Sequence, residues 1–251
     1  MLKRLGIRYK QARDYLRSPD ENYIAKLQEV QQIIQRSAED PEHIVVLFLD
    51  ELTFYRQPSL ARAYERSGKA QPLARLGHRT NYTSRIVAGM EIWQGKVVYL
   101  QRSKITLATL RVYYQHLADS FPEAETIYVI QDNWPVHYHP DVLAVLMEQE
   151  LQWPLRKLQN WPAEPRKGIQ SLNLPIKLVF LPSYAPWTNP IEKLWRKMKQ
   201  EVLHLHRYED HWDELRDRMS NYLDHYSTGS AELLHYVGLS KPETLYKLPA
   251  S

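Results

Sequence analysis

Three long apolar runs stand out in the pattern of hydrophobic and polar positions. They begin at Ile44, Thr126 and Ile176, within the stretches HIVVLFLDE, TIYVIQDNW and IKLVFLP. Apolar runs of this length predict strands that are buried on both faces. The first two runs end in an acid, Asp50 and Asp132, and we expect each strand to close there.

Helical spacing of apolar residues predicts helices over residues 21–36, 106–118, 140–149 and 208–226. It also predicts a helix that contains Glu192 in its first turn. Two short runs, 85–91 and 96–101, flank Gln94-Gly95, which is a hairpin signal. Residues 52–83 have no clear period, and the prolines and glycines of 151–174 disfavour regular structure. The order of elements predicts an α/β fold with a mixed sheet, because a hairpin is antiparallel and crossover helices join parallel strands.

Composition narrows the classes of protein that the chain could belong to. With 251 residues, 43% of them hydrophobic and 25% charged, it is long enough for one good-sized core. The chain has no cysteine, which excludes disulfides, thiolate zinc sites and a cysteine nucleophile. Its longest wholly apolar run, Ile44 to Leu49, is too short to span a bilayer, and the N-terminus lacks the apolar core of a signal peptide.

Basic residues are clustered, although the net charge is only +4. The three clusters are Lys3, Arg4, Arg8, Lys10, Arg13 and Arg17; Arg56, Arg62, Arg66, Lys69, Arg75 and Arg79; and Lys193, Arg196, Lys197 and Lys199. Any one cluster is typical of a solvated surface. The three together favour a polyanionic partner, DNA or RNA.

The acids that follow the strands suggest a metal site. If the strands of Asp50 and Asp132 are parallel neighbours, both carboxylates lie at the carboxyl edge of the sheet, where α/β proteins bind ligands. Paired carboxylates need a positive charge between them, and oxygen ligands favour Mg²⁺ or Mn²⁺. Each Asp could instead be a turn or cap residue. Spacing alone does not choose between Asp50 and its neighbour Glu51.

Glu192 has two interpretations. As a third carboxylate it would complete a two-metal site for phosphodiester chemistry. As the third residue of a helix with Asn189 as N-cap and Pro190 in first position, it would form a capping box and need no catalytic role.

The segments VVLFLDE, YVIQDNWPVH and LVFLPSYAPWTNPIEKLWRKMK resemble, in order, the three catalytic blocks of DDE transposases of the mariner superfamily, in its bacterial insertion-sequence branch. The resemblance covers residues 44–226. It implies an RNase H-like fold, with a mixed five-stranded sheet flanked by helices, and two Mg²⁺ or Mn²⁺ ions. It also implies that Asp50, Asp132 and Glu192 are the catalytic, metal-binding triad, with Asp50 preferred to Glu51.

The resemblance also implies a domain layout. Residues 1–19 are expected to be the remnant of a helix-turn-helix DNA-binding region, in a truncated product or one part of a split transposase. Residues 20–227 are expected to form the catalytic domain, with a clamp-like loop at 51–83 and an insert at 151–174. A C-terminal tail, 228–251, follows.

The expected partners are double-stranded DNA, as transposon ends and a TA target, and a second subunit in a paired-end complex. The expected location is the bacterial cytoplasm. The resemblance gives the loop arginines a role at DNA and the partner subunit. The residues expected to contact DNA or orient the site are Asn133, His137, Arg62, Arg66, Lys69, Arg196 and Lys199.

The resulting hypothesis is a transposase catalytic domain that cuts the element's ends with water and then joins the freed 3′-hydroxyl to target DNA. Two alternatives remain open at this point. One is a truncated or domesticated relative that binds DNA without cutting it. The other is a stand-alone nuclease of the same fold, because hydrolysis is the first step of both reactions.

Overall fold

The computed structural model describes residues 18–153 and 155–246. The predicted helix-turn-helix remnant therefore lies, up to residue 17, outside the described residues.

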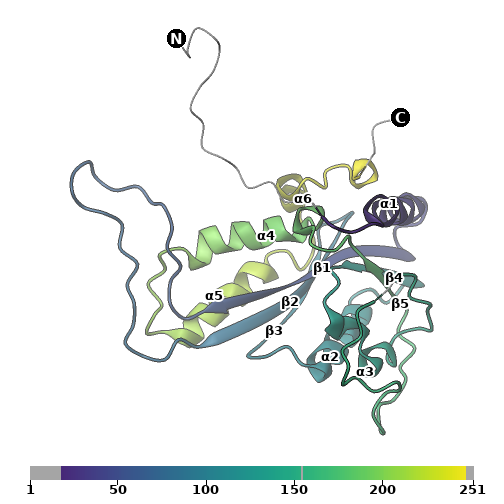
Figure 1. The fold of residues 1–251 in the computed structure, drawn as a ribbon. Helices are drawn as coiled ribbons and strands as arrows, with labels where there is room; N and C mark the ends of the chain where they lie inside the picture. Colours follow the sequence, from purple (N-terminus) through teal and green to yellow (C-terminus); the bar gives the residue numbers. More distant parts are fainter. Residues whose placement is uncertain (1–17, 154, 247–251) are drawn as a thin grey trace, which may run out of the picture.

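A five-stranded mixed sheet forms the centre of the molecule, with strand order β3-β2-β1-β4-β5 (Figure 1). The strands β1, β2 and β3 are antiparallel neighbours, and β4 and β5 run parallel to β1. This arrangement confirms the predicted mixed α/β sheet with a hairpin on one side. The strands are β1 (Ile44–Tyr55), β2 (Thr83–Glu91), β3 (Val97–Arg102), β4 (Thr126–Gln131) and β5 (Ile176–Phe180).

The first strand does not close at Asp50, as the sequence had suggested. It continues to Tyr55, because β2 pairs with it as far as Tyr55↔Thr83. On its other side, pairing with β4 ends at Phe48↔Ile130. Asp50 thus lies inside a strand but beyond the end of its parallel neighbour.

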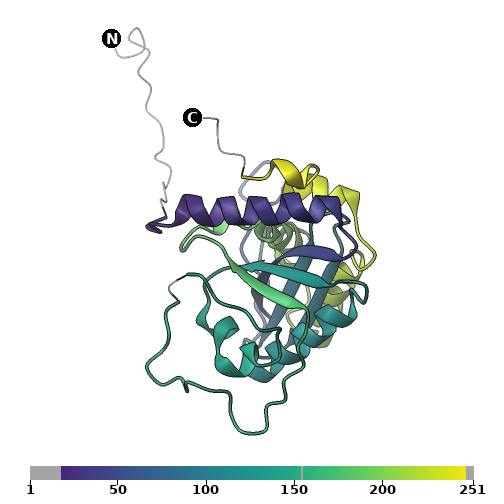
Figure 2. The same cartoon turned by 90° about the vertical axis from the view of Figure 1, so that its right-hand side faces the viewer.

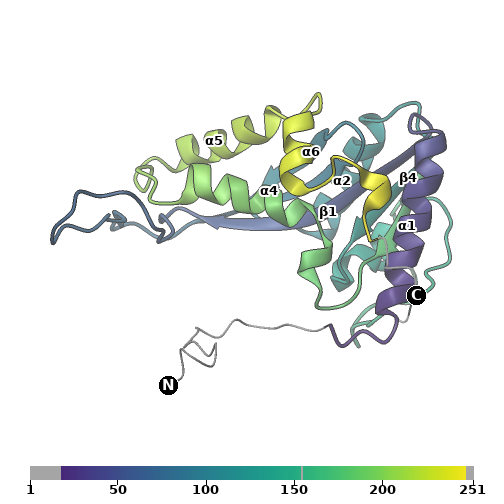
Figure 3. The same cartoon turned by 90° about the horizontal axis from the view of Figure 1, so that it is seen from above.

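Two layers of helices cover the sheet, one on each face (Figures 2 and 3). The alternation of side chains along β1 divides the core between them: Phe48 belongs to the cluster that includes α4, and Leu47 to the cluster that includes α2. The first layer comprises α1 (Tyr23–Glu39), α4 (Ile191–Met198), α5 (Trp212–Asp224) and α6 (Ala231–Val237). The second comprises α2 (Leu107–Asp119) and the short α3 (Pro140–Leu143).

The helix predicted over 140–149 is wrong in its length, because α3 ends at Leu143. Tertiary hydrogen bonds replace the missing helical ones. The backbone N–H of Met147 donates to the carbonyl of Leu174. The Gln149 side chain bonds to the free edge of β5, accepting from the backbone N–H of Leu178 at 2.8 Å.

Two further segments bear on the predicted domain layout. The described residues of 151–174 form no helix and no strand, as predicted, and Arg166 holds the segment to the fully buried Asp141. The segment expected to be a tail contains α6, whose Leu233 and Val237 belong to the core, and Gly238 ends this helix with φ +88. In the described part of the chain, no helix has the length and apolar character needed to cross a membrane.

Gly89 shows how closely the sheet and α2 approach. A Cβ atom at this position of β2 would lie 2.7 Å from Leu47 Cδ1 and 2.8 Å from Tyr113 Oη, both of which are buried. We expect Gly89→Ala to lower the free energy of unfolding by about 1–3 kcal/mol, because an added methyl group overpacks this interface. Urea unfolding measures the change. Unaltered stability would mean that the two side chains move aside freely.

Candidate active site

The two aspartates lie on one face of the sheet because of the strand register. Phe48 of β1 is paired with Ile130 of β4, and both side chains belong to the core beneath α4. Asp50 lies two positions further along β1 and so points to the same face. Asp132 is the first residue after β4, at the sheet edge, where its charge acts on Asp50. Glu51 has the opposite parity and points to the α2 face, which separates it from Asp50.

Helix α4 brings Glu192 to the same place. Glu192 lies in the first turn of the helix, and Trp195, three residues later, donates from Nε1 to Asp50 Oδ2 at 2.9 Å. Residues three apart lie on one helix face. The buried Trp195 therefore fixes the helix face that carries Glu192 over Asp50.

The capping-box interpretation of Glu192 is wrong in this structure. Pro190 is the N-cap, and no side-chain hydrogen bond caps this end of α4 among the described residues. Asn189, which was expected to cap, donates from Nδ2 to the Leu49 carbonyl of β1 at 3.0 Å. The residue that precedes the helix thus anchors it to the strand beside Asp50.

Neighbouring carboxylates disfavour the ionisation of Asp50 and of Glu192. Burial, and then the charges of Glu192, Glu51 and Asp132, raise the pKa of Asp50 to about 8. Burial also raises the pKa of Glu192. The charge of Asp132 raises this pKa further, whereas the charges of Lys199 and Arg196 lower it. The site therefore favours a bound cation, which would allow all three groups to ionise.

The pKa of Asp132 is raised too, although its side chain is open to solvent at the sheet edge. The protein around the carboxyl displaces part of its water, and the backbone N–H of Trp134, which donates at 2.9 Å, offsets part of this effect. Asp132 is thus the member of the trio most accessible from outside.

The donor set fits a hard divalent cation, because carboxylate oxygens are the ligands of Mg²⁺ and Mn²⁺. Within residues 18–153 and 155–246, no three acidic or histidine side chains are drawn together around one point as they would be in a closed metal cage. The carboxylates therefore share a region of the surface and an electrostatic field, and their side chains stand apart.

A polar network that the sequence did not predict lies on the α2 face of the sheet. Glu51 Oε1 lies 3.0 Å from His137 Nε2, and His137 Nδ1 lies 3.0 Å from the Tyr114 hydroxyl. The Tyr114 hydroxyl also donates to Gln131 Oε1 at 3.3 Å. The network links the residue after Asp50 to the residue before Asp132.

His137 itself has no exposed surface, so contact with DNA, one of its two expected roles, does not fit the structure. Its contacts with Glu51 of β1 and Tyr114 of α2 leave the orienting role as the expectation. Asn133 is half-buried and donates from Nδ2 to the Leu181 carbonyl at 2.7 Å, which holds the loop after β5 against the second aspartate.

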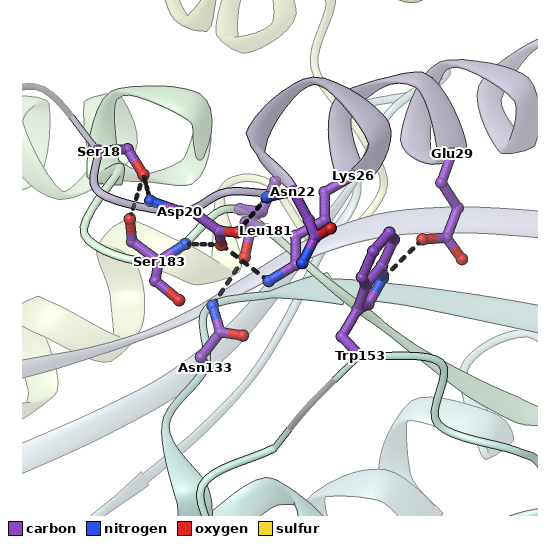
Figure 4. Close-up of polar contacts among 9 residues, drawn as sticks. All are labelled: Ser18, Asp20, Asn22, Lys26, Glu29, Asn133, Trp153, Leu181 and Ser183. Carbon is purple, nitrogen blue, oxygen red and sulfur yellow. Dashed lines mark hydrogen bonds and ion pairs between the residues drawn. The ribbon is translucent and has the colours of Figure 1, made fainter.

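A second unforeseen contact joins the start of the described chain to that loop (Figure 4). Asp20 accepts from the Ser183 backbone N–H at 2.7 Å and forms a buried ion pair with Lys26 at 2.9 Å. Burial alone would raise the pKa of Asp20, but the hydrogen bonds from Ser183, Lys26 and Asn22 lower it. In the sequence, Ser18-Pro19-Asp20 had indicated only a break before a helix.

The expected DNA-contacting residues fall into two groups. Arg196 and Lys199 are exposed and line one groove together with Glu192 and Trp187. Arg62, Arg66 and Lys69 are exposed on the long loop 56–82, which projects from the body of the molecule (Figures 1 and 3). The first group thus lies beside Glu192, and the second lies on a loop that projects away from the body of the molecule.

The family described as DDE superfamily endonuclease matches residues 45–216, which include all three carboxylates. The chain belongs to this family. It is 22% identical over 212 residues to the "Insertion element IS630 uncharacterized 39 kDa protein" of Shigella sonnei, a match that covers 84% of this chain and 53% of the relative. The chain therefore spans about half the length of the curated relative it matches.

Solved structures show the same fold at low identity. A Mos1 transposase paired-end complex with left transposon end matches with a TM-score of 0.59 at 15% identity, over 98% of this chain and 67% of that one. A pre-cleavage Mos1 transpososome matches with a TM-score of 0.61 at 14% identity, again over 98% and 67%. The predicted RNase H-like fold is confirmed, and the family is one of endonucleases.

Proposed function

We propose that this chain is the catalytic part of a DNA transposase, which hydrolyses a phosphodiester at each transposon end and then joins the freed 3′-hydroxyl to target DNA. The observation that carries the proposal is that three carboxylates share one region of the surface and a common electrostatic field. Asp50 and Asp132 lie on one face through the β1–β4 register, beneath the helix that carries Glu192. Family membership supports the same chemistry.

Asp50, Asp132 and Glu192 would hold two divalent ions, Mg²⁺ or Mn²⁺, which supply Lewis-acid polarisation of the phosphate and countercharge. Mos1 mariner paired-end complexes have been solved with Mn and with Mg, which supports the choice of ion. Trp195 holds the Asp50 carboxylate in place. Asn133 holds the loop that leads to α4.

The basic residues would bind the DNA backbone. Arg196 and Lys199 lie in the groove of Glu192, where they would contact phosphates next to the bond that is cut. Arg62, Arg66 and Lys69 would contact more distant DNA from the projecting loop, in the manner of a clamp. The solved Mos1 relatives are complexes with transposon ends, which supports double-stranded DNA as the partner.

The remaining parts of the proposal follow the family resemblance. The chain would act as a homodimer on paired ends and insert at TA sequences, in the cytoplasm of a bacterium, which is the kind of organism that carries the IS630 relative. Residues 1–19 would be the remnant of a DNA-binding region. Residues 20–227 would be the catalytic domain, with its clamp-like loop (51–83) and insert (151–174), and 228–251 its tail.

Two substitutions at Glu192 test the proposal. Because Glu192 makes no capping bond, Glu192→Gln and Glu192→Ala should both leave the free energy of unfolding within about 0.5 kcal/mol of the parent. Both should lower metal-dependent strand cleavage by a factor of about 10² or more, because neither side chain carries a charge to bind the ions.

Thermal melts and a nicking assay on supercoiled DNA, in Mg²⁺ and in Mn²⁺, measure the two effects. If Glu192→Gln cuts at the parental rate, the third ligand lies elsewhere. A strand-transfer assay with pre-cut ends then separates the candidates. Joined products support a transposase, whereas nicking without joining supports a stand-alone nuclease.

A further inference from the structure

An exposed tryptophan forms part of the wall of the groove that contains Glu192. Trp187 lines this groove with Glu192, Arg196 and Lys199, and 49% of its surface is open to solvent. One edge of the indole is fixed, since Nε1 donates to the Tyr23 hydroxyl of α1 at 3.2 Å. The ring is therefore held at one edge while half of its surface remains free.

A second exposed aromatic residue precedes it in the same loop. Tyr184 is 78% exposed and has φ +54, a left-handed conformation that is unusual for a bulky residue. The contacts of its neighbour explain how this strain persists. Ser183 is held on both sides, as its N–H donates to Asp20 at 2.7 Å and its carbonyl accepts from Ser18 Oγ at 2.6 Å (Figure 4).

The left-handed backbone of Tyr184 costs free energy, and the exposed rings of Tyr184 and Trp187 leave apolar surface in water. Backbone strain persists where the surrounding structure enforces it, and it gathers at functional sites. An exposed aromatic ring offers a face on which a nucleobase can stack. Trp187 lies in a groove with two cations, Arg196 and Lys199, which match the phosphates of a nucleic acid, and the faces of the exposed rings match its bases.

We propose that Trp187 stacks on an unpaired nucleobase of the strand that is cut, with Tyr184, three residues earlier in the same loop, as a second stacking surface. The inference rests on the proposed function and adds a requirement to it, that the duplex is opened at the active site. A paired base has both faces covered by its neighbours, so only a base outside the stack can meet the indole face. Such stacking tolerates any base, because every base has a π-face.

The competing explanation is structural, namely that Trp187 serves only to hold α1 through Tyr23. Three variants of the full chain separate the two. Trp187→Ala removes both the ring face and the bond to Tyr23. Trp187→Phe keeps a ring face and removes the bond, and Tyr23→Phe removes the bond alone.

The probe is an oligo-dT strand about 12 nucleotides long, within the range that single-strand sites span, beside a fully abasic strand of the same length. Binding is measured by fluorescence anisotropy at low salt in EDTA, so that cleavage does not interfere. We expect Trp187→Ala to weaken oligo-dT binding about tenfold or more and to leave abasic binding within about twofold. Trp187→Phe and Tyr23→Phe should bind oligo-dT within about threefold of the parent.

Two outcomes would overturn the inference. One is parental oligo-dT affinity in Trp187→Ala. The other is an equal loss for oligo-dT and abasic strands, or an equal loss in Tyr23→Phe, either of which would show a structural role. The assay contains no metal and scores no cleavage, so its failure leaves the carboxylate assignment standing. If the Glu192 variants cut DNA at the parental rate, so that the carboxylate assignment is wrong, the binding assay would still test the stacking of Trp187.

Discussion

Asp50→Asn should lower metal-dependent strand cleavage by a factor of about 10³ or more and, at the same time, stabilise the metal-free protein at alkaline pH. The first effect follows from the position of Asp50 near Asp132 and Glu192, whose charges act on it, since an amide supplies no charge to hold the ions. The second follows from the pKa of Asp50, which burial and the neighbouring carboxylates raise to about 8.

The sign of the pH effect follows from linkage. An aspartate has a pKa of about 3.9 in the unfolded chain, so between this value and about pH 8 the folded protein binds a proton that the unfolded chain has lost. The free energy of unfolding that this group contributes is therefore complete below about pH 4 and is lost as pH rises through 8. Asp50→Asn should therefore reduce the fall in the free energy of unfolding between about pH 4 and about pH 8. Mg²⁺ should reduce this fall in the parent but not in the variant.

Urea unfolding between pH 5 and 9, with and without Mg²⁺, would check this expectation beside the nicking assay. Glu51→Gln is the matched control, because it removes an adjacent carboxylate that points to the opposite face of the sheet. It should cut DNA within about tenfold of the parent. Cleavage that survives Asp50→Asn and disappears in Glu51→Gln would show that the first metal ligand had been assigned to the wrong acid.

The projecting loop gives the second large expected effect. Replacing residues 60–76 with a short Gly-Ser linker should leave the melting temperature nearly unchanged and weaken DNA binding steeply. The neck of the loop survives, because the Gln57 side chain exchanges two hydrogen bonds of 2.9 Å with the backbone of Gly77. The exposed basic residues that are removed are Arg62, Arg66, Lys69 and Arg75.

Counterion release makes the prediction quantitative. Each lost phosphate contact on duplex DNA reduces the slope of log affinity against log salt by about 0.9, so four contacts correspond to a reduction of about 3–4. Gel shifts from low to moderate salt measure the slope. An unchanged slope would show that these residues are solvated and do not contact DNA.

Two variants that keep the full length of the loop separate the effect of its charges on DNA binding from the effect of its apolar side chains on dimer formation. Changing the four basic residues to Gln should reproduce the loss of slope. Changing the exposed apolar residues to Ser should leave the slope intact and, if the loop contacts a second subunit, reduce dimer formation on paired ends. The latter residues are Leu60, Tyr64, Leu73 and Leu76. Sedimentation of the DNA complex measures the second effect.

Local patterns in the sequence were sufficient for most of the secondary structure. The three apolar runs became β1, β4 and β5, and Gln94-Gly95 became the turn between β2 and β3. These predictions succeeded because burial on both faces and tight turns are decided by residues close together in the chain. The acids at the sheet edge could be predicted for the same reason, because Asp50 and Asp132 directly follow apolar runs in the sequence.

The choice among those acids depended on tertiary structure. Whether Asp50 or Glu51 faces Asp132 depends on the register between β1 and β4, and a shift of one residue would exchange them. The role of Asn189 was likewise decided by a partner 140 residues away, the carbonyl of Leu49, which took the side chain that the local sequence had assigned to a helix cap.

The sequence by itself thus determined the strands, most of the helices and the candidate acids at the sheet edge. Only the tertiary structure decided how far β1 extends, where α3 stops and which side of the sheet each carboxylate faces. It also decided that Tyr184 is held in a strained, exposed conformation through the contacts of Ser183 with Ser18 and Asp20. The physical reason is that these features rest on hydrogen bonds between distant segments, whose partners become neighbours only when the chain folds.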